Sequence, residues 1–62
     1  MDMAMNTYPV VFSPKDPAGL PWIIPVQAVN SASAIASAPR ELAYWFAQDA
    51  ANFQPPKIQG AP

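Results

Sequence analysis

Few side chains in this chain have the chemistry that catalysis requires. The sequence contains no cysteine and no histidine, so a serine nucleophile has no imidazole base, and zinc and similar metals lack their preferred ligands. Lys15 and Lys57 lie in proline-rich segments, which predict no buried pocket to activate an amine. Glu41 and Asp49 are separated by about 12 Å along a helix axis, too far to act on one substrate. We therefore expect no enzyme, no cofactor, no metal ion and no small-molecule substrate.

The large apolar side chains indicate a different role, which is binding to other proteins by burial of apolar surface. Tryptophan, tyrosine and phenylalanine dominate the cores of protein interfaces, and each buries on the order of 150–250 Å² when covered. An ordinary intramolecular core is the alternative use for such residues. The predicted partner-binding residues are Tyr8, Phe12, Trp22, Ile23, Ile24, Leu42, Trp45, Phe46 and Phe53.

One segment has the periodicity of an amphipathic helix, at about residues 39–53. Leu42, Trp45, Phe46 and Phe53 recur at helical spacing on one face, while Tyr44 falls on the opposite, more polar face together with Glu41, Gln48 and Asn52. A proline at position 39 suits a first helical turn, and another at position 55 ends the pattern.

The remaining segments predict little regular structure. Residues 1–30 read as an extended proline-rich arm, 31–38 as a Ser/Ala-rich connector and 54–62 as an extended tail. For the connector, the alternative to a linker is a short helix that is capped by Asn30 or Ser31 and runs to Pro39, slightly favoured because alanine favours helix. Pro9, Pro21 and Pro25 interrupt the two β-prone runs in the arm, because proline cannot donate a ladder hydrogen bond. A loose hairpin between residues 8–12 and 22–29 is the alternative to two runs that lie along a partner. Asp16 and Gly19 mark a type I turn between them.

Length and charge complete the expected fold class. The chain has 62 residues, enough for one small domain, and a domain of that size without disulfides or metal is marginally stable. Only 11% of its residues are charged, compared with about 25% in a typical soluble domain. We therefore expect a small, irregular, mainly extended proline-rich chain with one amphipathic helix, whose fold is completed by partner chains.

The predicted function is a non-catalytic structural subunit that straps larger subunits of a multi-protein assembly together. A minor virion protein, from a capsid or tail, is the favoured assembly. One alternative is a small accessory subunit of a membrane complex, since residues 20–38 carry no charge, although prolines and polar residues interrupt them. A second alternative is a free-standing proline-rich adaptor. Three scattered basic residues form no basic patch, so we expect no nucleic-acid partner.

Overall fold

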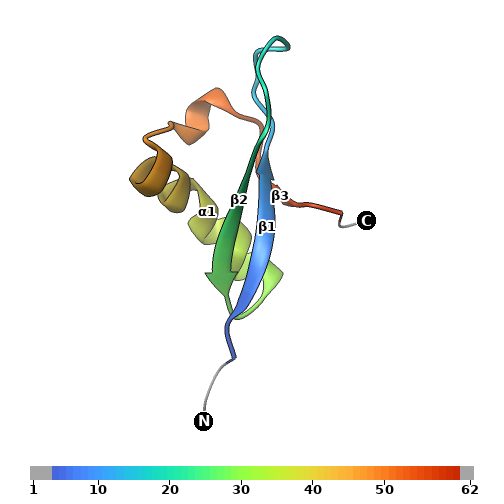
Figure 1. Cartoon of the computed structure of the whole chain (residues 1–62), viewed down its shortest axis with the longest axis vertical. Coiled ribbons are helices and arrows are strands. Elements are labelled where there is room, and N and C mark those ends of the chain that lie inside the picture. The colour runs from blue at the N-terminus through green and yellow to red at the C-terminus, as the bar shows by residue number, and fades with distance from the viewer. Residues whose placement is uncertain (1–3, 61–62) are drawn as a thin grey trace.

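The structure is a computed structural model that describes residues 4–60. It has two layers, a three-stranded antiparallel sheet and a helix packed on one of its faces (Figure 1). The elements in chain order are β1 (Asn6–Phe12), β2 (Trp22–Ala28), α1 (Ser31–Phe46), the 3-10 helix η1 (Ala50–Asn52) and β3 (Lys57–Ile58). The strands lie in the order β2-β1-β3, so β1 is central.

The first two strands form a hairpin, despite the prolines within them. Pro9 lies directly opposite Pro25 in the register of β1 and β2. In an antiparallel pair every second residue pair exchanges no hydrogen bonds, and a proline there removes no bond between the two strands. The expectation of two separate extended runs was wrong because both prolines occupy such a position, and the hairpin alternative is the arrangement found.

The helix is shifted toward the N-terminus relative to the range predicted from periodicity. It begins after Asn30, whose side chain accepts a hydrogen bond from the Ser33 N–H at 2.8 Å, the geometry of an N-cap. It includes Pro39 in its interior and ends at Phe46, followed by the C-cap Ala47, which adopts a left-handed conformation with φ 53°. The predicted helix at residues 39–53 was therefore wrong at both ends. The Ser/Ala segment 31–38 forms the first half of α1.

The hydrophobic core lies between the helix and the sheet. Alternate residues of β1 and β2 point toward α1, while α1 contributes residues at intervals of four, which places them on one stripe. The fully or nearly fully buried side chains are Val10, Phe12, Ile24, Val26, Ala28, Ala34, Ala38, Leu42 and Phe53. Small alanines in α1 let the helix backbone approach the sheet closely.

The segment after the helix folds back onto the hairpin. The Gln54 N–H donates to the Ser13 carbonyl at 2.7 Å, and the Lys15 N–H donates to the Asn52 carbonyl at 3.0 Å. Further along, β3 pairs with β1, and the Gln59 N–H donates to the Pro9 carbonyl at 2.8 Å. The expectation of an extended tail over residues 54–62 missed the third strand at residues 57–58, and residues 61–62 lie outside the described part of the chain.

These contacts overturn the expected fold class. The described residues form a compact domain of three antiparallel strands and one helix, not a mainly extended chain whose fold awaits partner chains. The reason is that the apolar runs expected to cover a partner cover one another instead. In residues 4–60 no helix is both long and apolar enough to cross a membrane.

Candidate protein-binding surface

The structure divides the nine predicted binding residues into three groups. Phe12, Ile24, Leu42 and Phe53 are buried in the core, where no partner can reach them without unfolding the domain. Tyr8 and Trp22 are partly buried and pack against that core. Ile23, Trp45 and Phe46 remain exposed. This last group offers a partner the most exposed area.

The exposed aromatic residues gather at the end of α1. Leu42 is the last buried residue of the helix, and Tyr44, Trp45 and Phe46 follow it in its final turn. Consecutive helical residues point about 100° apart, so three in a row cannot all face the sheet. Their side chains are 75%, 67% and 40% exposed, respectively. We call these three residues the aromatic surface.

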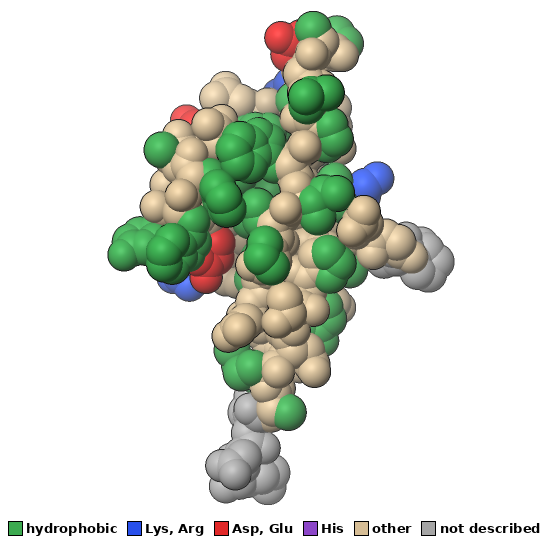
Figure 2. Space-filling view, viewed as in Figure 1, with side chains coloured by type: hydrophobic (Ala, Val, Ile, Leu, Met, Phe, Trp, Pro, Cys, Tyr) green, Lys and Arg blue, Asp and Glu red, His purple; other side chains and the backbone are tan. Residues whose placement is uncertain are grey.

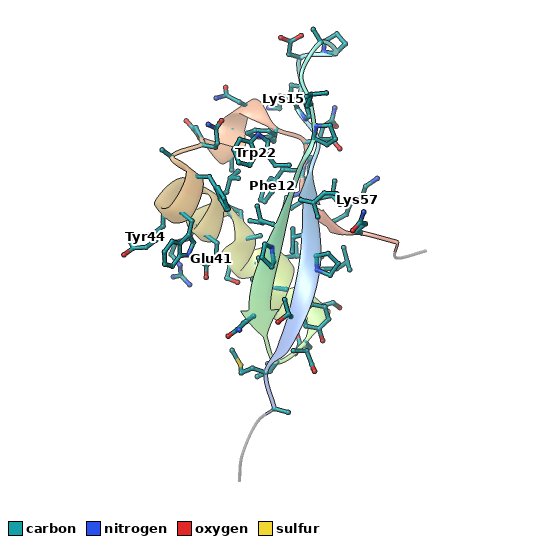
Figure 3. The ribbon with its side chains drawn as sticks, in the orientation of Figure 1. Phe12, Lys15, Trp22, Glu41, Tyr44 and Lys57 are labelled. Atoms are coloured by element: carbon teal, nitrogen blue, oxygen red, sulfur yellow. The ribbon has the colours of Figure 1, made fainter. Side chains whose placement is uncertain are left out.

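Contacts among neighbouring side chains hold the aromatic surface in place. The rings of Tyr44 and Trp45 meet edge to face, with centroids 4.8 Å apart, and Phe46 lies 5.3 Å from Trp22 on the sheet. The Trp45 Nε1–H donates to the Glu41 Oε2 at 2.6 Å, one helical turn away. In Figure 3, Trp22 and Phe12 lie between helix and strands, whereas Tyr44 points away from them. Because these contacts restrict the rings before binding, the rings lose less conformational entropy when a partner binds.

A groove connects the aromatic surface to the sheet. It has a volume of about 310 Å³ and is lined by Pro25 of β2 together with Trp45 and Phe46 of α1. Figure 2 shows hydrophobic side chains over this side of the molecule, with few charged groups among them. The groove is open and mainly apolar, so it can hold an apolar side chain of a ligand.

Two charged residues, Arg40 and Glu41, lie one helical turn before the aromatic surface. Glu41 is the acidic residue that the hydrogen bond from Trp45 brings to the aromatic surface. Its carboxylate has lone pairs beyond the one that accepts from the indole, so it can also accept from a cationic ligand group. Within residues 4–60 no three His, Cys, Asp or Glu side chains are grouped as a metal site would need.

Sequence reasoning missed one residue of the aromatic surface and one of the groove. Tyr44 falls on the polar side of the predicted helix, although its position next to Trp45 and Phe46 makes a run of three aromatics. In the sequence, Pro25 indicates only an interruption of strand pairing. The run of aromatics was a usable signal, because no helix can bury three consecutive large side chains against one sheet. The contribution of Pro25 depends on the tertiary fold and has no local signal.

The chain matches no protein family, no curated protein and no solved structure.

Proposed function

We propose that this chain is a non-catalytic, protein-binding subunit of a larger assembly, and that it docks through the aromatic surface and the adjoining groove. The observation that supports this most is the exposure of three consecutive aromatic residues on a domain that has already built its core from other side chains. The folded chain thus binds as a unit, and its N-terminal strands are structural parts of the domain.

The composition of the aromatic surface supports a protein partner. Tryptophan and tyrosine are the residue types most enriched among those that dominate binding energy at interfaces. Lone exposed hydrophobic residues are common on soluble proteins, but Tyr44, Trp45 and Phe46 adjoin one another and border a groove. A surface of this kind stabilises a complex chiefly by removing apolar area from water.

The groove and its acidic neighbour suggest what the partner presents. An aliphatic side chain fits the apolar groove beside Pro25, while an arginine or lysine suits the carboxylate of Glu41. A guanidinium can also lie over the face of Trp45 or Tyr44 and gain a cation–π interaction. The proposed partner is therefore a larger protein subunit with an apolar side chain next to a basic one.

The low content of charged residues supports membership of an assembly. With 11% charged residues, the chain has little of the charge that keeps free small domains apart in solution. A minor virion protein stays our prediction for the assembly, and an accessory subunit of a membrane complex stays the alternative. The adaptor alternative shares the same docking surface and differs in requiring no permanent partner.

Sedimentation of the protein in extracts of its own source tests the proposal. A tagged chain should sediment with a large particle, and the double change Trp45→Ser and Tyr44→Ser should move it to the position of a free small protein. Both residues are exposed, so we expect the variant to remain folded, as circular dichroism would show. Leu20→Ser is a matched control, because Leu20 is 82% exposed but lies in the turn between β1 and β2.

Two results would refute the proposal. The first is a natural chain that sediments only as a free monomer in those extracts. The second is a folded Trp45→Ser and Tyr44→Ser variant that stays in the large particle as fully as the Leu20→Ser control. Glu41→Gln gives a finer test, since it should weaken assembly mainly at low salt if a basic partner residue contacts this carboxylate.

A further inference from the structure

Among residues 4–60, strand β2 forms an outer edge of the sheet, with no strand on its far side. The order β2-β1-β3 leaves seven residues, Trp22–Ala28, along this edge. A strand of that length with free N–H and C=O groups is a template for pairing with another chain, so proteins generally block such edges. The sequence of β2 contains one residue that cannot donate a backbone hydrogen bond, which is Pro25.

The direction in which Pro25 presents its backbone follows from two observations. The Pro9 carbonyl accepts from the Gln59 N–H, so the C=O of Pro9 points toward β3 and away from β2. Pro25 lies directly opposite Pro9, so the two form a non-hydrogen-bonded pair. In such a pair the backbone N and C=O of both residues point away from the space between the two strands. The backbone of Pro25 therefore points to the free edge of β2, where its ring replaces the N–H that an added strand would use.

The same alternation identifies the donors that remain. Ile23 and Gln27 lie two positions to either side of Pro25, so their N–H groups point to the free edge as well. Any strand added along β2 would meet a missing donor and a projecting pyrrolidine ring midway between these two. The continuous ladder that an edge-to-edge dimer needs is thus interrupted at its centre.

We propose that Pro25 prevents the free edge of β2 from pairing with the same strand of a second copy, and that this keeps the domain monomeric in the absence of its partner. The fold itself does not require proline here. The Pro25 side chain is exposed, it fills no space in the core, and its extended backbone suits any β-branched residue. The other outer strand, β3, is protected differently, since it has only two residues.

The test replaces the proline and measures association. Pro25→Val restores the N–H and has high strand propensity, so it should produce dimers or larger species by analytical ultracentrifugation, at concentrations where the natural chain is a monomer. Pro9→Val is the matched control. It changes the directly opposed proline, but the new N–H points toward β3, so this variant should stay monomeric.

A chemical variant separates the donor from the ring. The 62-residue chain is short enough to be synthesised with N-methylvaline at position 25, which keeps the valine side chain but again removes the N–H. It should be monomeric where Pro25→Val associates. Two results would overturn the proposal: a folded Pro25→Val chain that remains monomeric up to its solubility limit, or N-methylvaline and Pro9→Val chains that associate as strongly as Pro25→Val.

Discussion

Phe53 packs edge to face on Phe12, with ring centroids 5.9 Å apart and an interplanar angle of 73°. Phe12 is the last residue of β1, and Phe53 is the residue that follows η1. This contact joins the segment after the helix to the hairpin, beside the hydrogen bonds from Gln54 to Ser13 and from Lys15 to Asn52. It closes the core at the end of the sheet where the helix terminates.

Truncation of Phe53 should therefore affect the whole domain. Phe53→Ala removes a nearly fully buried aromatic ring, and such changes typically cost about 3–5 kcal/mol. Small domains have total stabilities at the low end of about 5–15 kcal/mol. We expect the natural chain to unfold cooperatively as an isolated monomer, and Phe53→Ala to lose most or all of that transition in a circular dichroism melt.

The matched control for this change keeps the residue apolar. Phe53→Leu retains much of the buried volume and should preserve a cooperative transition at a lower temperature. If the isolated natural chain showed no transition at all, the self-contained core described above would be refuted, and a fold completed by partners would have to be considered again. If Phe53→Ala melted like the natural chain, the contact with Phe12 would contribute nothing to stability.

Ala47 offers a site where stability should increase. It is the C-cap of α1 and has φ 53°, and its N–H donates to the Ala43 carbonyl at 3.1 Å. The left-handed conformation costs a residue with a Cβ atom about 1–2 kcal/mol, whereas glycine adopts it freely but loses about 0.5–1 kcal/mol more entropy on folding. Ala47→Gly should therefore stabilise the domain by about 0.5–1 kcal/mol and raise its melting temperature by a few degrees.

The same substitution one turn earlier should have the opposite sign. Ala43 is exposed and lies within the helix, where glycine costs about 1 kcal/mol relative to alanine. Thermal melts of Ala47→Gly and Ala43→Gly should thus move in opposite directions from the natural chain. Two shifts of equal sign and size would show that the left-handed C-cap is not strained.

The hairpin shows which features of the fold local sequence signals can predict. The β-prone runs and the turn between them were visible in the sequence, and they produced the hairpin alternative. The prolines favoured the wrong choice, because the cost of proline in a strand depends on whether its N–H would face the neighbouring strand. That depends on register, and the register sets Pro9 against Pro25 through pairing along the whole of both strands. A local count of prolines does not contain this information.

The predicted ends of the helix were wrong for a similar reason, because they too depend on tertiary packing. Pro39 suits a first turn, and the apolar spacing extends to Phe53, so both signals favoured residues 39–53. The structure uses Asn30 as the cap, tolerates Pro39 inside α1 and places Phe53 in the core by a separate turn. Burial of Ala34, Ala38 and Leu42 outweighs the local cost of the proline.

The predicted binding residues of the helical segment divide in two. Trp45 and Phe46 are exposed, as a partner-binding role requires. Leu42 and Phe53 were also predicted to bind a partner, but they lie in the core.

The N-cap of α1 gives a prediction that tests this shifted start. The Asn30 side chain accepts from the Ser33 N–H, and loss of such a cap typically costs about 1 kcal/mol. Asn30→Ala should lower the free energy of unfolding by about that amount, measured by chemical denaturation. Asn30→Ser should stay within a few tenths of a kcal/mol of the natural chain, because serine is also a good N-cap. Equal stability of Asn30→Ala and the natural chain would contradict a helix that begins at Ser31.

The two tryptophans should report on different environments. Trp22 is partly buried and packs against Phe46, whereas Trp45 is 67% exposed. In single-tryptophan variants of the folded chain, acrylamide should quench Trp45, studied in Trp22→Phe, more strongly than Trp22, studied in Trp45→Phe. Denaturant provides the control, because unfolding should make the two quenching constants similar. Similar constants in the folded chains would mean that Trp45 is covered without a partner, which would remove the main support for docking through the aromatic surface.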